Sequence, residues 1–183
     1  MHFLQWRTYE QIAKRAFCQA RKIAAGSWLA LTTCAPPPPA SALQAEQRVR
    51  EAAAELCECD CGTVMFIPTF ETEYAHAIVM TNVTVIEYNP SFVENLCETC
   101  KVGLLGHEYG HHLSHPSLWA TTKEAELEAD RISGCMLRLR GMDPTDWMSV
   151  MLTFGWEETE THPNGPTRAN AIREGWEACG VVE

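Results

Sequence analysis

The sequence GLLGHEYGHHL, residues 103–113, contains three histidines and one glutamate within six consecutive positions. His107, Glu108 and His111 form the motif H-E-x-x-H, in which the two histidines stand four positions apart. On a helix such residues share one face, so both imidazoles can reach a single zinc ion. Glu108 follows the first histidine and can take a proton from a water molecule at the metal. The motif predicts a catalytic metal helix, and the alternative is a solvated helix with scattered polar groups.

The neighbouring histidines are expected to have other roles. His112 is rotated by about 100° from His111 on a helix, so its ring points away from the metal. We expect His112 and His115 to support the ligands or to lie at the surface. A histidine six positions after His111 would indicate a metzincin, but that position is Ser117, which excludes that class.

A catalytic zinc normally has three protein ligands and one open position, so a further ligand is needed. The next acidic cluster comprises Glu124, Glu126, Glu128 and Asp130. On a helix, Glu126 and Asp130 border an apolar stripe that must face the core, whereas the other two point further outward. Glu126 is therefore the best third ligand, and Asp130 is placed to orient a ligand histidine. The alternative is an exposed acidic face, which is the commoner fate of such clusters.

The order of HEYGHH, ELEADRISGCMLRLRG and THPNGPTRANAIREGW resembles the M48 peptidase family, zinc peptidases of the gluzincin class. The resemblance covers about residues 83–178, and IEYNPSFVENL is similar to the short soluble bacterial members. It implies a zincin-like fold and one catalytic zinc ion held by His107, His111 and Glu126, with Glu108 as general base. The membrane-embedded members carry several hydrophobic spans, which this sequence lacks, so their membrane substrates are not implied.

Two residues beyond the acidic helix complete the predicted site. In this fold, His162 could approach the zinc and stabilise the oxyanion formed during hydrolysis; the alternative is an ordinary loop histidine. Arg168 could pair with Asp130 or Glu126 and hold the last helix against the site; the alternative is a surface arginine. The substrate is expected to be a peptide or protein bound in extended form along a sheet edge. Either AHAIVMT at 75–81 or VTVIEY at 83–88 could supply that edge.

The segment pattern predicts an α+β fold, because the expected strands come early in the chain and most helices come late. The domain should be mostly helical, with a small β-sheet packed beside the H-E-x-x-H helix. Gly134 should permit close approach of a neighbouring helix. We expect strands at 63–70, 75–81 and 83–88, and helices at 43–56, 89–96, 101–115, 123–140, 143–154 and about 167–178.

The proline-rich sequence APPPPASA at 35–42 separates residues 1–41 from the expected peptidase domain at 42–183, because consecutive prolines form a stiff extended tether. Before it, Arg21 and Lys22 precede the apolar run IAAGSWLAL, as in a secretory signal peptide, and Cys34 stands where a lipid could be attached. We therefore expect export to the periplasm, the cell envelope or the exterior. The alternative is an amphipathic N-terminal helix that lies on a membrane or on the domain.

The composition narrows the set of partners. The 183 residues carry a formal net charge of −10, and residues 1–34 alone are basic, so the remainder is strongly acidic. An acidic body argues against nucleic acid, because phosphate binding needs a basic surface. No apolar run reaches the length of a transmembrane span. The oligomeric state does not follow from the sequence.

The nine cysteines favour disulfides in an oxidising compartment over further metal binding. Cys57, Cys59 and Cys61 could be linked to Cys97 and Cys100, and the alternative is a second, structural zinc site. Cys135 is expected to be a buried free thiol.

The leading hypothesis is a zinc metalloendopeptidase. A catalytically silent zincin-fold binding or regulatory protein at the cell envelope is the main alternative, and a disulfide-bonded surface protein that binds metal incidentally is a third. Glu108 favours the first hypothesis, because a pure binding protein does not need a general base.

Overall fold

The computed structural model describes residues 38–57, 62–79, 83–114, 122–154 and 157–180. The expected N-terminal segment with Cys34, together with Cys59, Cys61 and His115, lies outside these residues. Among the described helices, none combines the length and apolar character that crossing a membrane requires.

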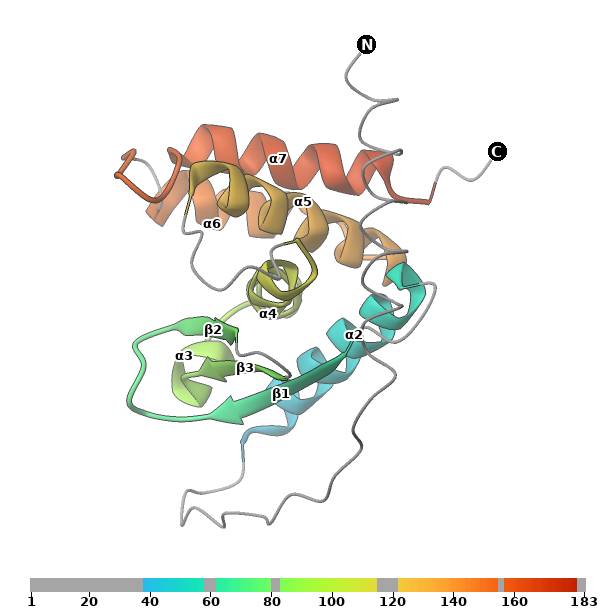
Figure 1. Ribbon diagram of the computed structural model, residues 1–183, viewed down its shortest axis with the longest axis vertical. Helices are drawn as coiled ribbons and strands as arrows, with labels where there is room; N and C mark the ends of the chain where they lie inside the picture. The colour runs from blue at the N-terminus through green and yellow to red at the C-terminus, as the bar shows by residue number, and fades with distance from the viewer. Residues whose placement is uncertain (1–37, 58–61, 80–82, 115–121, 155–156, 181–183) are drawn as a thin grey trace.

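Helix α4 (Glu98–Ser114) lies in the middle of the molecule and carries the H-E-x-x-H motif (Figure 1). A small sheet and helix α2 (Ala40–Leu56) lie on one side of it. Helices α5 (Lys123–Leu139), α6 (Thr145–Phe154) and α7 (Gly165–Ala178) lie on the other side. The described part of the chain is therefore α+β and mostly helical, with a small sheet beside the motif helix, as the sequence predicts.

The described strands, β1 (Thr63–Pro68), β2 (Ala75–Val79) and β3 (Val83–Tyr88), form a sheet in the order β1-β3-β2. Strand β3 is parallel to β1 and antiparallel to β2. VTVIEY is thus the central strand, and the expectation that it could serve as a free edge is wrong. Strand β2, from the sequence AHAIVMT, is an edge strand and packs against α4.

Side chains cap several of the described helices at their first turns. Asn89 accepts hydrogen bonds from the backbone N–H groups of Ser91 and Phe92 at the start of helix α3 (Pro90–Glu94). Thr122 caps α5, and the side chain of Asn164 caps α7 by accepting the Thr167 N–H. Helix α7 therefore begins at Gly165, two residues before the predicted start. These caps satisfy backbone donors that would otherwise have no partner inside the helix.

Helices α5 and α7 pack closely because glycines face the contact. A Cβ atom at Gly134 would collide with the carbonyl oxygen of Ile172, so the predicted close approach at Gly134 is confirmed. The short separation places Cys135 against Cys179, with 5.0 Å between their Cα atoms, and the two form a disulfide. The expectation that Cys135 is a free thiol is therefore wrong, because α7 brings a second cysteine to the same contact.

A second disulfide joins Cys97 to Cys100 at the start of α4. Cys57 is also disulfide-bonded, but its partner is neither of these two cysteines. The expected link between residues 57–61 and 97–100 is therefore wrong, since Cys97 and Cys100 bond to each other. The described cysteine pairs agree with the predicted preference for disulfides and with an oxidising environment.

Candidate metal centre

Helices α4 and α5 bring His107, His111 and Glu126 together. One ligand atom from each residue lies within 4.8 Å of the other two. Nε2 of His107 is 3.3 Å from Oε2 of Glu126, and Nε2 of His111 is 3.4 Å from Oε1 of the same carboxylate. The ring centroids of the two histidines are 4.8 Å apart. These three side chains could hold one metal ion.

The backbone of α4 permits this geometry because Gly110 lies between the two histidines in sequence. A Cβ atom at position 110 would lie 2.8 Å from the Cα of Ala129, closer than real Cβ contacts allow. Glycine therefore lets α5 approach α4 beside the histidines. The approach brings the Glu126 carboxylate within reach of both imidazoles.

The surroundings of Glu126 fit a bound cation. Its side chain is only 5% exposed, and Oε2 has no hydrogen-bond partner among the described residues. A buried carboxylate oxygen without a partner is costly, and a metal ion would remove that cost. Two imidazoles and one carboxylate are also a donor set found in catalytic zinc sites that keep one position open.

Asp130, one turn after Glu126, contacts the ring nitrogen of His107 that does not face Glu126. Its Oδ1 accepts a hydrogen bond from Nδ1 of His107 at 2.9 Å, and its side chain is fully buried. When Nδ1 carries the proton, the lone pair of Nε2 points toward Glu126. The contact therefore selects the tautomer and ring orientation that a metal ligand needs.

Arg168 on α7 forms an ion pair with the carboxylate of Asp130. Its Nε donates to Oδ2 of Asp130 at 2.8 Å, and its Nη2 donates to Oδ1 at 3.0 Å. Nη2 also lies 3.8 Å from Oε2 of Glu126, so Arg168 contacts both predicted partners. This two-point contact joins α7 to α5 and positions the carboxylate that orients His107.

The charges of the centre shift the pKa values of its groups. Burial lowers the pKa of His107, but the carboxylates of Asp130 and Glu126 together outweigh burial and raise that pKa to about 9. Burial and the positive charge of His107 lower the pKa of His111 to about 4. Burial raises the pKa of Glu126, but the hydrogen bond to His107 and the charges of the three nearby histidines together keep that pKa below its usual value. A metal ion must therefore displace a proton from His107 and finds His111 already neutral near pH 7.

Glu108, the predicted general base, faces the sheet edge. Its side chain is buried, and its carboxylate accepts a hydrogen bond from the backbone N–H of Ala77 in β2. Burial raises its pKa, while the charge of His107 opposes the increase. The sequence did not indicate Ala77, because the contact uses its main chain rather than its side chain.

The loop before α7 places His162 at the same centre. Its Nε2 is 3.5 Å from Oε2 of Glu126, and its side chain is 51% exposed. Nδ1 lies 2.8 Å from the hydroxyl of Thr161, and the backbone N–H of His162 donates to the hydroxyl of Thr159. His162 therefore lies beside the three candidate ligands and remains open to solvent.

His112 points away from the centre, as expected, but it does not lie at the surface. It is 2% exposed, and its Nδ1 is 2.6 Å from the hydroxyl of Thr84 on β3. The spacing of Leu105, Tyr109 and His112 is that of one helix face, and all three are buried. That spacing could have identified the face of α4 that contacts the sheet.

The chain matched no protein-family model, no curated protein and no solved structure. The function must therefore be inferred from the residues of the centre.

Proposed function

We propose that this protein is a zinc-dependent metalloendopeptidase with a zincin-like fold. The carrying observation is the carboxylate of Glu126, buried between two imidazoles with one oxygen lacking a hydrogen-bond partner. His107, His111 and Glu126 would hold the metal. Glu108 next to His107 distinguishes this arrangement from a simple metal-binding site, because a binding protein has no need of a buried carboxylate beside the ligands.

When bound, zinc supplies a Lewis acid that polarises the substrate carbonyl and lowers the pKa of a water molecule. Glu108 takes the proton from the attacking water and later delivers it to the leaving amine. His162 donates a hydrogen bond to the oxyanion as the carbonyl becomes tetrahedral. Asp130 and Arg168 do not touch the substrate; they hold His107 in position through the hydrogen bonds described above.

The edge strand β2 is the proposed binding site for the substrate backbone. A peptide that adds a strand to a sheet edge obtains its affinity from main-chain hydrogen bonds. Glu108 contacts the main chain of Ala77 on that strand, so a peptide lying along β2 would pass close to the proposed base. Export of the protein is part of the proposal and is supported by the Cys97–Cys100 and Cys135–Cys179 disulfides.

The test combines metal analysis with proteolysis by the purified full chain. We expect about one zinc ion per chain and cleavage of an unfolded generic protein such as casein. Glu108→Gln should keep the zinc and lose activity by about 10²–10⁴-fold, the usual contribution of a general base. The matched control is Glu124→Gln, because Glu124 is an exposed carboxylate on α5.

Each outcome separates the hypotheses. Stoichiometric zinc without Glu108-dependent cleavage would support a silent binding protein, and absence of zinc would refute both hypotheses. Loss of zinc in Glu126→Ala, but not in Glu124→Ala, would support the choice of the third ligand.

A further inference from the structure

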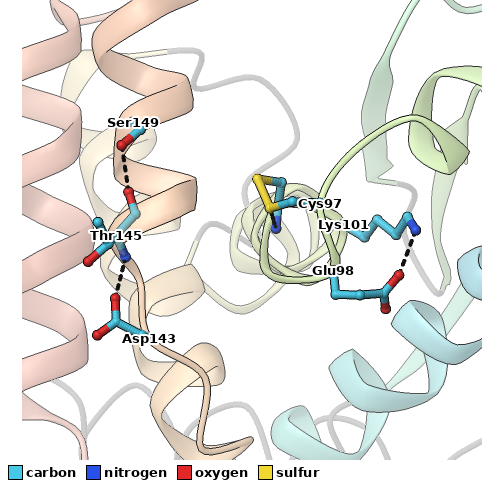
Figure 2. Close-up of a disulfide and its surroundings, with 7 residues drawn as sticks. Cys97, Glu98, Lys101, Asp143, Thr145 and Ser149 are labelled. Atoms are coloured by element: carbon cyan, nitrogen blue, oxygen red, sulfur yellow. Dashed lines mark hydrogen bonds and ion pairs between the residues drawn. A yellow bond between two sulfur atoms is a disulfide. The ribbon is translucent and has the colours of Figure 1, made fainter.

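The sequence Cys97-Glu98-Thr99-Cys100 begins α4, at the end of the helix opposite the proposed metal ligands. The two cysteines form a disulfide, which the proposed peptidase mechanism does not use. Figure 2 shows this disulfide on a side of α4 away from the ion pair between Glu98 and Lys101. It therefore needs an explanation of its own.

The two sulfur-bearing residues differ in access to solvent. Cys97 is exposed, whereas Cys100 is 4% exposed and belongs to the hydrophobic core. An external thiol can therefore approach the sulfur of Cys97 but not that of Cys100. Such an asymmetry defines which sulfur is attacked and which sulfur leaves.

The helix start stabilises a thiolate at Cys97. The carbonyl of Cys97 accepts the Lys101 N–H at 2.9 Å, so Cys97 is the N-cap residue of α4. The N–H of Cys100 donates to Sγ of Cys97 at 3.0 Å. A hydrogen-bond donor and the positive end of a helix both favour the charged form of a sulfur. Glu98 and Lys101 are paired at 2.7 Å, so their charges largely offset each other there.

The disulfide also contributes little as a structural constraint. It closes a ring between positions three apart, whereas Cys135–Cys179 spans a separation of 44 residues. A short ring removes less freedom from the unfolded chain than a long one. The bond can therefore open while α4 stays folded.

We propose that Cys97 and Cys100 form a reversible redox site that exchanges with external thiols at Cys97. An external thiolate attacks Sγ of Cys97, the Cys97–Cys100 bond breaks, and Cys100 leaves as a thiolate that takes a proton from solvent. A second external thiolate attacks the external sulfur of the mixed disulfide and releases Cys97 as a thiolate, which also takes a proton from solvent. Two external thiols are oxidised to one disulfide, and the protein gains two electrons and two protons.

The test treats the full chain under native conditions with reduced glutathione, followed by alkylation and peptide mass mapping. We expect Cys97–Cys100 to be reduced at least tenfold faster than Cys135–Cys179, with unchanged circular dichroism. In Cys100→Ser, oxidised glutathione should form a mixed disulfide at Cys97 and release one reduced glutathione. In Cys97→Ser, the buried Cys100 should react at least tenfold more slowly.

Two results would overturn the proposal. One is reduction of Cys97–Cys100 only when the chain unfolds, together with Cys135–Cys179. The other is equal labelling of the two cysteines in the folded single variants, as judged by circular dichroism. Neither measurement uses peptidase activity, so failure of the proposed function would leave this test intact.

Discussion

Replacing Asp130 by asparagine tests whether this carboxylate orients the centre. Asp130 accepts hydrogen bonds from Nδ1 of His107 at 2.9 Å and from Nε and Nη2 of Arg168 at 2.8 and 3.0 Å. Asparagine is nearly isosteric but replaces one acceptor oxygen with an NH₂ group, which then faces a donor. The substitution therefore removes a negative charge and sets two donors against each other in a buried place.

The expected loss of stability follows from these contacts. A hydrogen bond to a charged group contributes about 1.5–3 kcal/mol, and removing one partner of a buried ion pair costs about 3–5 kcal/mol. Because asparagine keeps one acceptor and Arg168 is 13% exposed, we expect a decrease of about 2–3 kcal/mol in the free energy of unfolding. Zinc affinity should fall by about 10–100-fold, as is usual when the group that orients a ligand histidine is lost.

Urea unfolding in the presence of a chelator measures the stability, and competition with a chromogenic chelator measures the zinc affinity. Glu128→Gln is the matched control, because Glu128 is also on α5 and pairs with Arg131 near the surface at 3.4 Å. It should change stability by less than about 1 kcal/mol. If Asp130→Asn matches this control in both assays, the reasoning about orientation is refuted.

Three further variants, one of them a double substitution, test the packing of the fold. Gly110→Ala should push α5 away from α4, weaken zinc binding and destabilise the fold by about 1–3 kcal/mol, as overpacking does. Replacing both Cys135 and Cys179 by serine should lower the unfolding free energy by about 4 kcal/mol, from the loop-closure relation for their separation. Thr84→Val should remove the hydrogen bond to the buried imidazole on α4 and cost about 1–3 kcal/mol.

Denaturant unfolding checks each of the three variants against its own control. Gly106→Ala, one turn before Gly110, places its Cβ 3.4 Å from the flexible sulfur of Met136 and should be tolerated. Replacing both Cys97 and Cys100 by serine should cost about half as much as removing the Cys135–Cys179 disulfide, since the closed ring is short. Thr84→Ser keeps the hydroxyl and should retain more stability than Thr84→Val. If a variant and its control change the free energy of unfolding equally, the packing, disulfide or hydrogen-bond contribution assigned to that variant is contradicted.

The grouping of His107, His111 and Glu126 was largely predictable, because it follows from the spacing of residues within two helices. The spacing of His107 and His111 places both on one face of any helix, and the apolar stripe of the next helix separates Glu126 from Glu124. Contact between these two helices then follows from burying their apolar faces. The α+β class could also be predicted from local patterns, because segments with the periodicity of strands come early in the chain and segments with the periodicity of helices come late.

Features that depend on tertiary packing were not predictable. The order β1-β3-β2 depends on which strands pair in the folded chain, where β2 and β3 contact α4, so the sequence could not distinguish the edge strand from the central one. The pairing of Cys135 with Cys179 requires the close contact of α5 and α7. The hydrogen bond from Ala77 to Glu108 uses a backbone group that every non-proline residue possesses.

Helix α4 contains glycines at positions 103, 106 and 110, each about 1 kcal/mol less favourable in a helix than alanine. A peptide with this sequence would therefore be a poor helix in water, and its histidines would not hold a fixed spacing. The ligand geometry arises only when the sheet and the later helices surround α4. The three candidate ligands would therefore come together only in the folded chain, so any metal bound to them should report the fraction of folded molecules in a sample.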